Sequence, residues 1–225
     1  MKRFLLPLAM VMLGCSVGLA AGDDLKEKVS SSVSGTVTTW RIYRPVISQP
    51  EKNYTKIKYE EGDVITLEAS GCDQTGGHGK TWKRYVDPQG PNADRLYHGL
   101  IEMRGVTDKF KASPTGKKGL VRILDTGLKN ISTGLFRGEF VVGDLSKVPE
   151  KDRYLRLGFE DDDYSDNGYM DRNSDDGTGD QCKDLGTSYV VLTIDTKNEK
   201  HSAAAKGKKG KEKKGKEAES PAPTK

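Results

Sequence analysis

The sequence predicts an all-β protein, an antiparallel β-sandwich with jelly-roll-like connections. It contains 26 Gly among 225 residues, well above the average of roughly 7%, and such a surplus indicates many tight turns. Between Gly35 and Asp195 the apolar residues form short runs that are separated by turn residues. No stretch of this body keeps the apolar period of an amphipathic helix, so strands are the expected secondary structure.

The expected strands follow one another along this body. They are Val37–Tyr43, Lys56–Tyr59, Val64–Ser70, Leu100–Met103, Leu120–Leu124, Gly134–Val142, Tyr154–Phe159 and Ser188–Ile194. The runs that begin at Val64 and Ser188 are especially rich in β-branched residues, which favour strands. Gly71–Gly99 and Glu160–Gly186 are predicted as long loops, and the loops of such a scaffold carry its variable chemistry.

Residues 1–22 have the composition of an export signal. Lys2 and Arg3 precede an apolar run, and a region of small residues follows it, as in secretory signals. The apolar run is too short to span a bilayer. Cleavage near residue 22 and lipidation of Cys15, as in a lipoprotein, are the two alternatives. Both predict an exported protein that is periplasmic, secreted or held at the cell surface.

Charge is distributed unevenly along the chain, whose net charge is +4. Residues 196–225 contain ten Lys and four Glu without aromatic or branched aliphatic residues, which predicts a disordered tail. Contact with an anionic surface and simple solvation are the two roles open to this tail. The remainder is acidic, which argues against nucleic acid as a partner. We expect residues 23–34 to be a short linker and residues 35–195 to be the domain.

Two cysteines, Cys72 and Cys182, remain once the signal segment is set aside. An even pair of cysteines in an exported protein favours a disulfide. A zinc site is the alternative, but it needs further ligands and the chain has three His. The sequence therefore predicts a Cys72–Cys182 disulfide.

The segment Glu160–Asp184 is strongly acidic, with ten carboxylates against two basic residues. Like charges held this close repel one another, and a bound cation relieves the repulsion. Asp, Asn and Ser oxygens suit Ca²⁺, and Asp163-x-Ser165-x-Asn167-Gly168 has the spacing that begins a calcium loop. A second group, Asp171–Gly177, offers ligands for another ion.

Two other interpretations of the acidic segment remain open. It is either a disordered acidic loop between two strands or a source of paired carboxylates for glycoside hydrolysis. Nothing in the sequence singles out a buried acid, and no nucleophile motif with a matched base is present. We therefore expect a protein that is not an enzyme.

Several motifs occur in the order found in one lectin family. They are Tyr59-Glu-Glu-Gly-Asp-Val-Ile-Thr-Leu-Glu-Ala-Ser-Gly71, then Trp82, Pro88-Gln-Gly90, Gly99-Leu-Ile101, Thr133-Gly-Leu-Phe-Arg137, Leu157-Gly-Phe-Glu-Asp161, Tyr164-Ser-Asp-Asn167 and Val190–Ile194. In these motifs residues 35–195 resemble the LecA (PA-I) galactophilic bacterial lectins. That resemblance implies a β-sandwich that binds sugar through a protein-held Ca²⁺, whose coordination two sugar hydroxyls complete.

The resemblance also implies a set of Ca²⁺ ligands. These are the backbone carbonyls of Tyr59 and Asp163 and the side-chain oxygens of Asp161, Asp166 and Asn167. This chain departs from the family at three points. The spacing from Asp161 to Tyr164 is shorter, Asp166 replaces an Asn, and residues 169–184 form an extra stretch after the site.

Arg95 and His98 stand where the family has its sugar-contacting His and Gln, and Trp82 could stack on a sugar face or anchor a loop. The expected function is that of an exported, calcium-dependent carbohydrate-binding protein whose partner is a galactose-like monosaccharide or a glycan. The alternative is an envelope structural or adhesion protein whose Ca²⁺ only stabilises the acidic loop. Assembly of identical copies is left open.

Overall fold

The computed structural model of the chain describes residues 27–76, 81–113, 119–168 and 181–196. These residues form twelve strands and two short 3₁₀ helices: β1 (Lys28–Ser34), β2 (Val37–Tyr43), β3 (Glu51–Lys58), β4 (Val64–Ser70), β5 (Cys72–Gly76), β6 (Thr81–Arg84), β7 (Gly99–Glu102), β8 (Val121–Arg122), η1 (Ile123–Thr126), β9 (Lys129–Ser132), β10 (Leu135–Val141), η2 (Glu150–Asp152), β11 (Tyr154–Phe159) and β12 (Tyr189–Asp195). The expected all-β class is confirmed.

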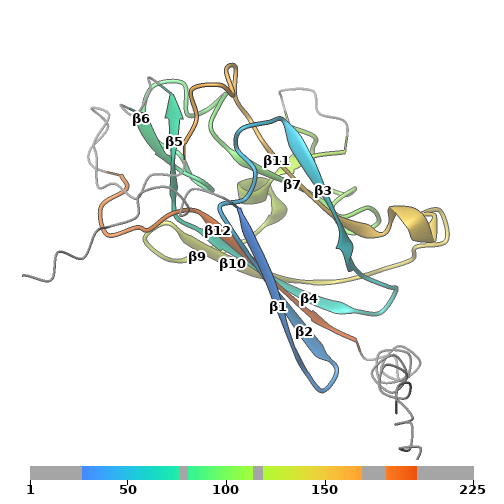
Figure 1. The fold of residues 1–225 in the computed structure, drawn as a ribbon. Coiled ribbons are helices and arrows are strands. Elements are labelled where there is room, and N and C mark those ends of the chain that lie inside the picture. The colour runs from blue at the N-terminus through green and yellow to red at the C-terminus, as the bar shows by residue number, and fades with distance from the viewer. Residues whose placement is uncertain (1–26, 77–80, 114–118, 169–180, 197–225) are drawn as a thin grey trace, which may run out of the picture.

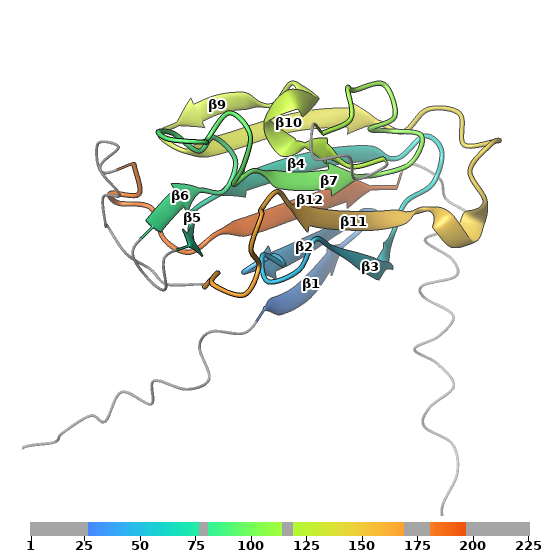
Figure 2. The same ribbon diagram turned by 90° about the horizontal axis from the view of Figure 1, so that it is seen from above.

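The strands form two antiparallel sheets and a separate hairpin (Figure 1). The larger sheet has the order β1-β2-β12-β4-β10-β9, and the smaller one has the order β3-β11-β7-β8. Strands β5 and β6 form the hairpin. β1 and β9 lie at opposite borders of the larger sheet, which Figure 2 shows from above. The two sheets pack face to face as a β-sandwich.

Alternation along the strands builds the core between the two sheets. In β12 the buried residues are Val190, Leu192 and Ile194, and the residues between them are half-buried. This period of two places every second side chain on the inner face. From the smaller sheet Leu155 and Leu157 reach the same core cluster.

Most of the expected strands are present within a few residues of the predicted bounds. The runs predicted at Val37–Tyr43, Val64–Ser70 and Tyr154–Phe159 are β2, β4 and β11 with unchanged bounds. The run at Leu120–Leu124 is different, because β8 covers two residues and the chain then turns into η1. Gly127, with φ of 78°, ends η1 in the left-handed region that favours glycine.

Residues 23–34 were expected to be a linker, but they contain strand β1. The expectation of a linker is therefore wrong for Lys28–Ser34. β1 has no apolar alternation strong enough to predict a strand, and all seven of its residues are exposed. It forms because Gly35, with φ of 61°, closes a tight turn that pairs Ser34 with Val37.

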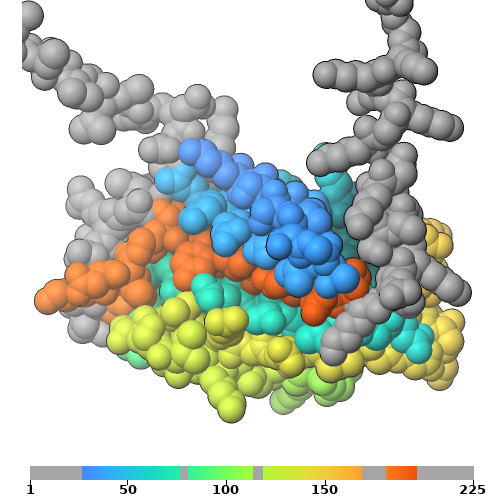
Figure 3. Space-filling view, turned by 90° about the horizontal axis from the view of Figure 1, so that it is seen from below, coloured from blue at the N-terminus to red at the C-terminus, as the bar shows by residue number. Residues whose placement is uncertain are grey.

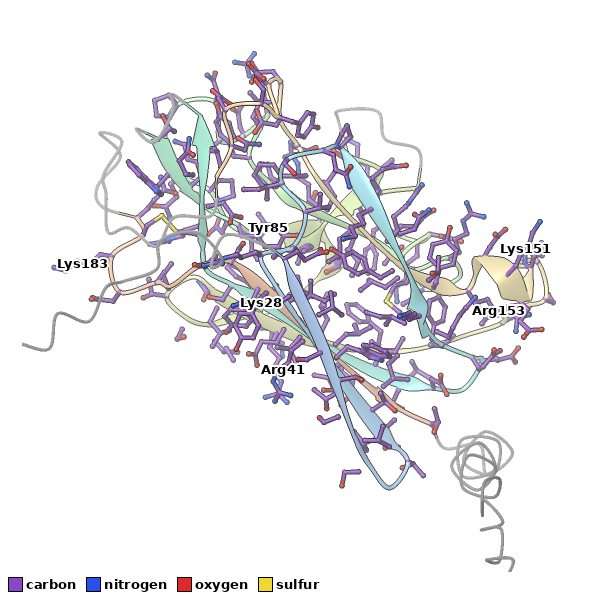
Figure 4. All side chains as sticks on the ribbon, viewed as in Figure 1. Lys28, Arg41, Tyr85, Lys151, Arg153 and Lys183 are labelled. Atoms are coloured by element: carbon purple, nitrogen blue, oxygen red, sulfur yellow. A yellow bond between two sulfur atoms is a disulfide. The ribbon has the colours of Figure 1, made fainter. Side chains whose placement is uncertain are left out.

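The expected disulfide is confirmed, with Cα atoms of Cys72 and Cys182 5.9 Å apart. Its yellow S–S bond lies beside the loop that carries Lys183 (Figure 4). Trp82 packs against it in a small buried cluster with Leu185. A structural disulfide indicates a compartment other than the cytoplasm.

No helix in the four described ranges is long and apolar enough to cross a membrane. The expected export signal at 1–22 lies outside the described residues, as does the expected tail apart from Thr196.

Candidate functional site

The candidate site is the loop Asp161–Gly168, which leaves the end of β11. Its first turns are held by carboxylates that accept hydrogen bonds from the local backbone. Asp161 Oδ1 accepts from the amides of Asp162 (2.8 Å) and Asp163 (3.2 Å). Asp163 Oδ1 accepts from the amide and the hydroxyl of Ser165, at 2.9 and 2.6 Å. These are the turns that short acidic side chains favour.

Strand β5 fixes the far end of the loop. Gln74 and Gly168 exchange two backbone hydrogen bonds of 2.9 and 2.8 Å. The Gln74 side-chain amide also donates to the carbonyl of Asp166 at 2.6 Å. The loop is thus pinned to the hairpin that the Cys72–Cys182 disulfide anchors.

Three polar groups converge inside this loop. The amide of Asn167 donates to the backbone carbonyl of Ile47 at 2.7 Å and to Asp161 Oδ2 at 2.8 Å. Asn167 Oδ1 is buried and has no hydrogen-bond partner among the described residues. The two ends of an Asn amide are exchanged by a flip of its side chain. The flipped amide would place three oxygens together, and oxygen is the ligand that Ca²⁺ prefers.

The carboxyl group of Asp161 has an altered acidity in this setting. Burial raises its pKa to about 6, and the hydrogen bonds from Asn167 and from the backbone of Asp163 oppose the rise. Burial has this effect because it disfavours the charged form of the carboxyl group. A cation beside the carboxylate would restore the charged form.

Tyr59 does not share this site with Asp161. Lys58 is paired with Tyr154 at the first residue of β11, whereas Asp161 follows its last residue, Phe159. At about 3.3 Å per residue this places the two positions on the order of 15 Å apart or more. At that end of the sandwich the Tyr59 hydroxyl donates to the carbonyl of Arg104 at 2.9 Å. The expectation that Tyr59 and Asp161 hold one ion is therefore wrong.

The backbone oxygen that lies beside Asp161 and Asn167 in the structure is that of Ile47. The loop between β2 and β3 comes close to the end of β11, where Phe159 donates its amide to the carbonyl of Pro50 at 3.1 Å. A backbone carbonyl has no residue signature, so no feature of the sequence points to Ile47.

The other two expected ligands lie on the same loop. Asp163 is exposed and its carboxylate is engaged with Ser165. A Cβ built on Gly76 would lie 3.4 Å from Asp166 Oδ2, so this carboxylate reaches the end of β5. Within the described residues no three His, Cys, Asp or Glu side chains stand close enough to hold a metal ion. The second expected group, Asp171–Gly177, lies outside the described residues.

Two of the three expected sugar contacts are buried. His98 is 4% exposed, and its Nδ1 lies 3.0 Å from Glu160 Oε2. Arg122 Nε lies 2.8 Å from the same oxygen, so His98 belongs to a buried polar cluster. Trp82 is also 4% exposed, because it packs on the disulfide. The expectation that His98 and Trp82 contact a sugar is therefore wrong.

Arg95 is exposed and stands near the start of the candidate loop. It lies in the turn before His98, and its guanidinium donates to Asn92 Oδ1. Tyr97 donates its amide to the carbonyl of Glu160 at 2.7 Å, and Glu160 donates to the carbonyl of His98 at 2.9 Å. The turn that carries Arg95 therefore runs beside the residue that precedes Asp161.

The buried cluster of Glu160, His98 and Arg122 is a feature that the sequence analysis missed. Glu160 is 0% exposed. In the sequence nothing distinguishes it from the other nine acids of the segment Glu160–Asp184. Its polar partners come from β8 and from the turn before β7, and no sequence pattern links those two segments.

No protein-family model, curated protein or solved structure matches this chain.

Proposed function

We propose that this protein is an exported, calcium-dependent carbohydrate-binding protein, a lectin whose loop-held Ca²⁺ coordinates sugar hydroxyls. The convergence of Asp161, Asn167 and the Ile47 carbonyl carries the proposal. Asn167 Oδ1 is buried without a partner among the described residues, which is costly, and a flip of the amide would turn this oxygen toward a cation held with Asp161 and the Ile47 carbonyl. The disulfide supports export.

The Ca²⁺ ligands in this proposal are the carboxylate of Asp161, the amide oxygen of Asn167 and the Ile47 carbonyl, with Asp163 and Asp166 beside them. Ca²⁺ takes about six to eight oxygens, so these five residues leave coordination places for sugar hydroxyls. The bound ion supplies a positive charge that fixes those hydroxyls. Exposed Arg95 would contribute donors at the edge and influence which sugar, galactose-like or related, is preferred.

A glycan array probed with and without a calcium chelator tests this function. We expect binding in millimolar Ca²⁺ that the chelator abolishes and that Arg95→Ala alters in sugar preference. Asn53→Ala, on an exposed residue of β3, is the matched control. Binding that survives the chelator would reject the calcium-dependent mechanism.

The burial of His98 and Trp82 favours a second candidate function. With these two residues in the interior, Arg95 is the remaining expected sugar contact that faces solvent. In this alternative the protein is a structural or adhesion component of the envelope, and Ca²⁺ only stabilises the loop. Normal Ca²⁺ binding without binding to any glycan on a broad array would favour this alternative.

A further inference from the structure

The edge of strand β1 is the least protected edge of the sandwich. β1 is an edge strand of the larger sheet. Its outer edge therefore faces no other described strand. All seven of its residues are exposed, and its pairing with β2 runs without a bulge. In the space-filling view β1, in dark blue, lies at the surface beside β2 (Figure 3). A straight, exposed edge of this kind is a template for pairing with another strand.

The other edges of the two sheets carry features that discourage pairing. β9 has four residues and a bulge in its pairing with β10. β3 has an irregular register, because Tyr54 and Lys58 lie opposite neighbouring residues of β11, and it contains three lysines. β8 has two residues. Short strands, bulges and lysines are the usual protections of an edge, whereas β1 has one charge, Lys28 at its first residue.

The sequence of β1 is complementary to itself in an antiparallel arrangement. It reads Lys28-Val-Ser-Ser-Ser-Val-Ser34, which is nearly symmetric about Ser31. In a second copy turned about Ser31, Val29 would lie opposite Val33, and Ser30 opposite Ser32. Lys28 would lie opposite Ser34, so no like charges would face each other. Isologous interfaces with two-fold symmetry require this kind of self-complementarity.

We propose that two copies of this chain associate through their β1 edges, which pair antiparallel about Ser31 and join the two larger sheets into one. The pairing would satisfy the backbone groups along both edges. It needs neither Ca²⁺ nor sugar, so it goes beyond the proposed function and is independent of it.

The side chains of β1 support a second copy as the occupant. Val29 lies opposite Ile42, a fully buried core residue, so Val29 and Val33 share the inner side of the sheet. They are nevertheless 44% and 70% exposed, and Val29 lines an open pocket with Trp40 and residues 53–57 of β3. In the paired arrangement each of these valines gains an apolar partner directly across the interface, which removes exposed apolar surface.

Glu27, the described residue before β1, turns away from this edge. Glu27 contacts the ammonium group of Lys52 and the hydroxyl of Tyr54, both on β3. Its side chain is therefore directed across the sandwich and away from the outer edge of β1.

Sedimentation velocity of the purified protein over a concentration series, in chelator, tests the proposal. We expect the mass of a dimer. Ser31→Lys and Ser31→Glu each place like charges opposite each other at the centre of the interface, and we expect each to weaken the dimer at least about tenfold. An equimolar mixture of the two variants should restore the dimer, because Lys then faces Glu.

Ser132→Lys and Ser132→Glu, on exposed β9, are the matched controls and should leave the dimer unchanged. A monomer at every concentration would overturn the proposal. A dimer that persists in both Ser31 variants would also overturn it, since the interface would then lie elsewhere. Failure of the mixture to restore the dimer would overturn the antiparallel register about Ser31.

Discussion

At the scale of single residues, Asn167 links the two sides of the candidate loop. Its amide bonds both the Ile47 carbonyl and the Asp161 carboxylate, so it can hold the loop closed without an ion. With the amide flipped, it would instead offer an oxygen to the ion. An Asn suits both states because one end of its side chain is a donor and the other an acceptor.

Asn167→Ala should therefore weaken both Ca²⁺ binding and the metal-free fold. We expect a loss of Ca²⁺ affinity of at least about tenfold, and a fall in the free energy of unfolding of about 1–2 kcal/mol in chelator. Calorimetric Ca²⁺ titration and urea unfolding measure the two quantities. Asn130→Ala, on exposed β9, should change neither. Unchanged Ca²⁺ affinity in Asn167→Ala would exclude this residue as a ligand.

Asp161 should make Ca²⁺ binding sensitive to mildly acidic pH. Burial raises its pKa to about 6 in the metal-free protein, and Ca²⁺ requires the carboxylate form. Protons therefore compete with the ion below that pH, and Ca²⁺ affinity should fall about tenfold between pH 7 and pH 5. Calorimetric titrations at the two pH values test this. An affinity that is equal at both would contradict the raised pKa.

The stability of the metal-free protein should change with pH in the opposite sense. The folded pKa of Asp161, about 6, lies above its ordinary value of 3.8, so the folded state binds the proton more tightly than the unfolded chain. Acidification from pH 6 toward pH 4 therefore stabilises the fold through this group. In chelator, Asp161→Asn should remove that contribution to the pH dependence of urea unfolding.

At the scale of elements, the β5–β6 hairpin connects the disulfide to the candidate loop. Cys72 begins β5, and Gln74, two residues later, bonds the loop at Gly168 and Asp166. Displacement of the hairpin would therefore displace the far end of the loop.

The double variant Cys72→Ala/Cys182→Ala should accordingly lower both stability and Ca²⁺ affinity. Loss of a native disulfide typically costs about 2–5 kcal/mol of unfolding free energy, which guanidinium unfolding in chelator would measure. A drop in Ca²⁺ affinity at a temperature where the variant is folded would reveal the connection through β5. Unchanged affinity there would show that the loop keeps its shape without the disulfide.

The sequence predicted those elements whose apolar pattern is local. Strands β4 and β12 alternate between buried and half-buried residues, and such alternation is visible in the order of apolar and polar residues along the sequence. By contrast, β5 contains polar residues that are all buried, and one of them, Asp73, accepts a hydrogen bond from Ser188 Oγ, which is far away in the sequence. Partners so distant in sequence leave no local pattern, and β5 was assigned to a loop.

The candidate site was predictable to the same extent. Asp161 and Asn167 belong to one loop whose side chains are rich in oxygen, so the sequence indicates both of them. In the structure they do converge. Ile47 contributes through its backbone, so its identity says nothing of its role. The motif that follows Tyr59 does not fix the position of Tyr59 itself, and the pairing of β3 with β11 places Tyr59 beyond the opposite end of β11 from Asp161.

At the scale of the whole molecule, Ca²⁺ should stabilise the folded domain, since the ligands come from segments far apart in the sequence. An ion that binds only the folded state adds about 2.7 kcal/mol at a hundredfold excess over its Kd. The melting temperature should therefore be higher in millimolar Ca²⁺ than in chelator, as differential scanning calorimetry would show. Equal melting temperatures would argue against a calcium site in this domain.

The two proposals together predict how the protein binds a surface that carries many glycans. A dimer joined at β1 would have two sugar sites, so its binding to such a surface gains from the second contact by a factor of about 10² or more. Ser31→Lys should therefore lose most of its apparent affinity for glycan-coated beads and keep the affinity of the unchanged protein for the free monosaccharide. Chelator should abolish both affinities and leave the dimer intact in sedimentation. Equal affinities of Ser31→Lys and the unchanged protein for the beads would mean that the two sites of a dimer cannot reach one glycan surface together.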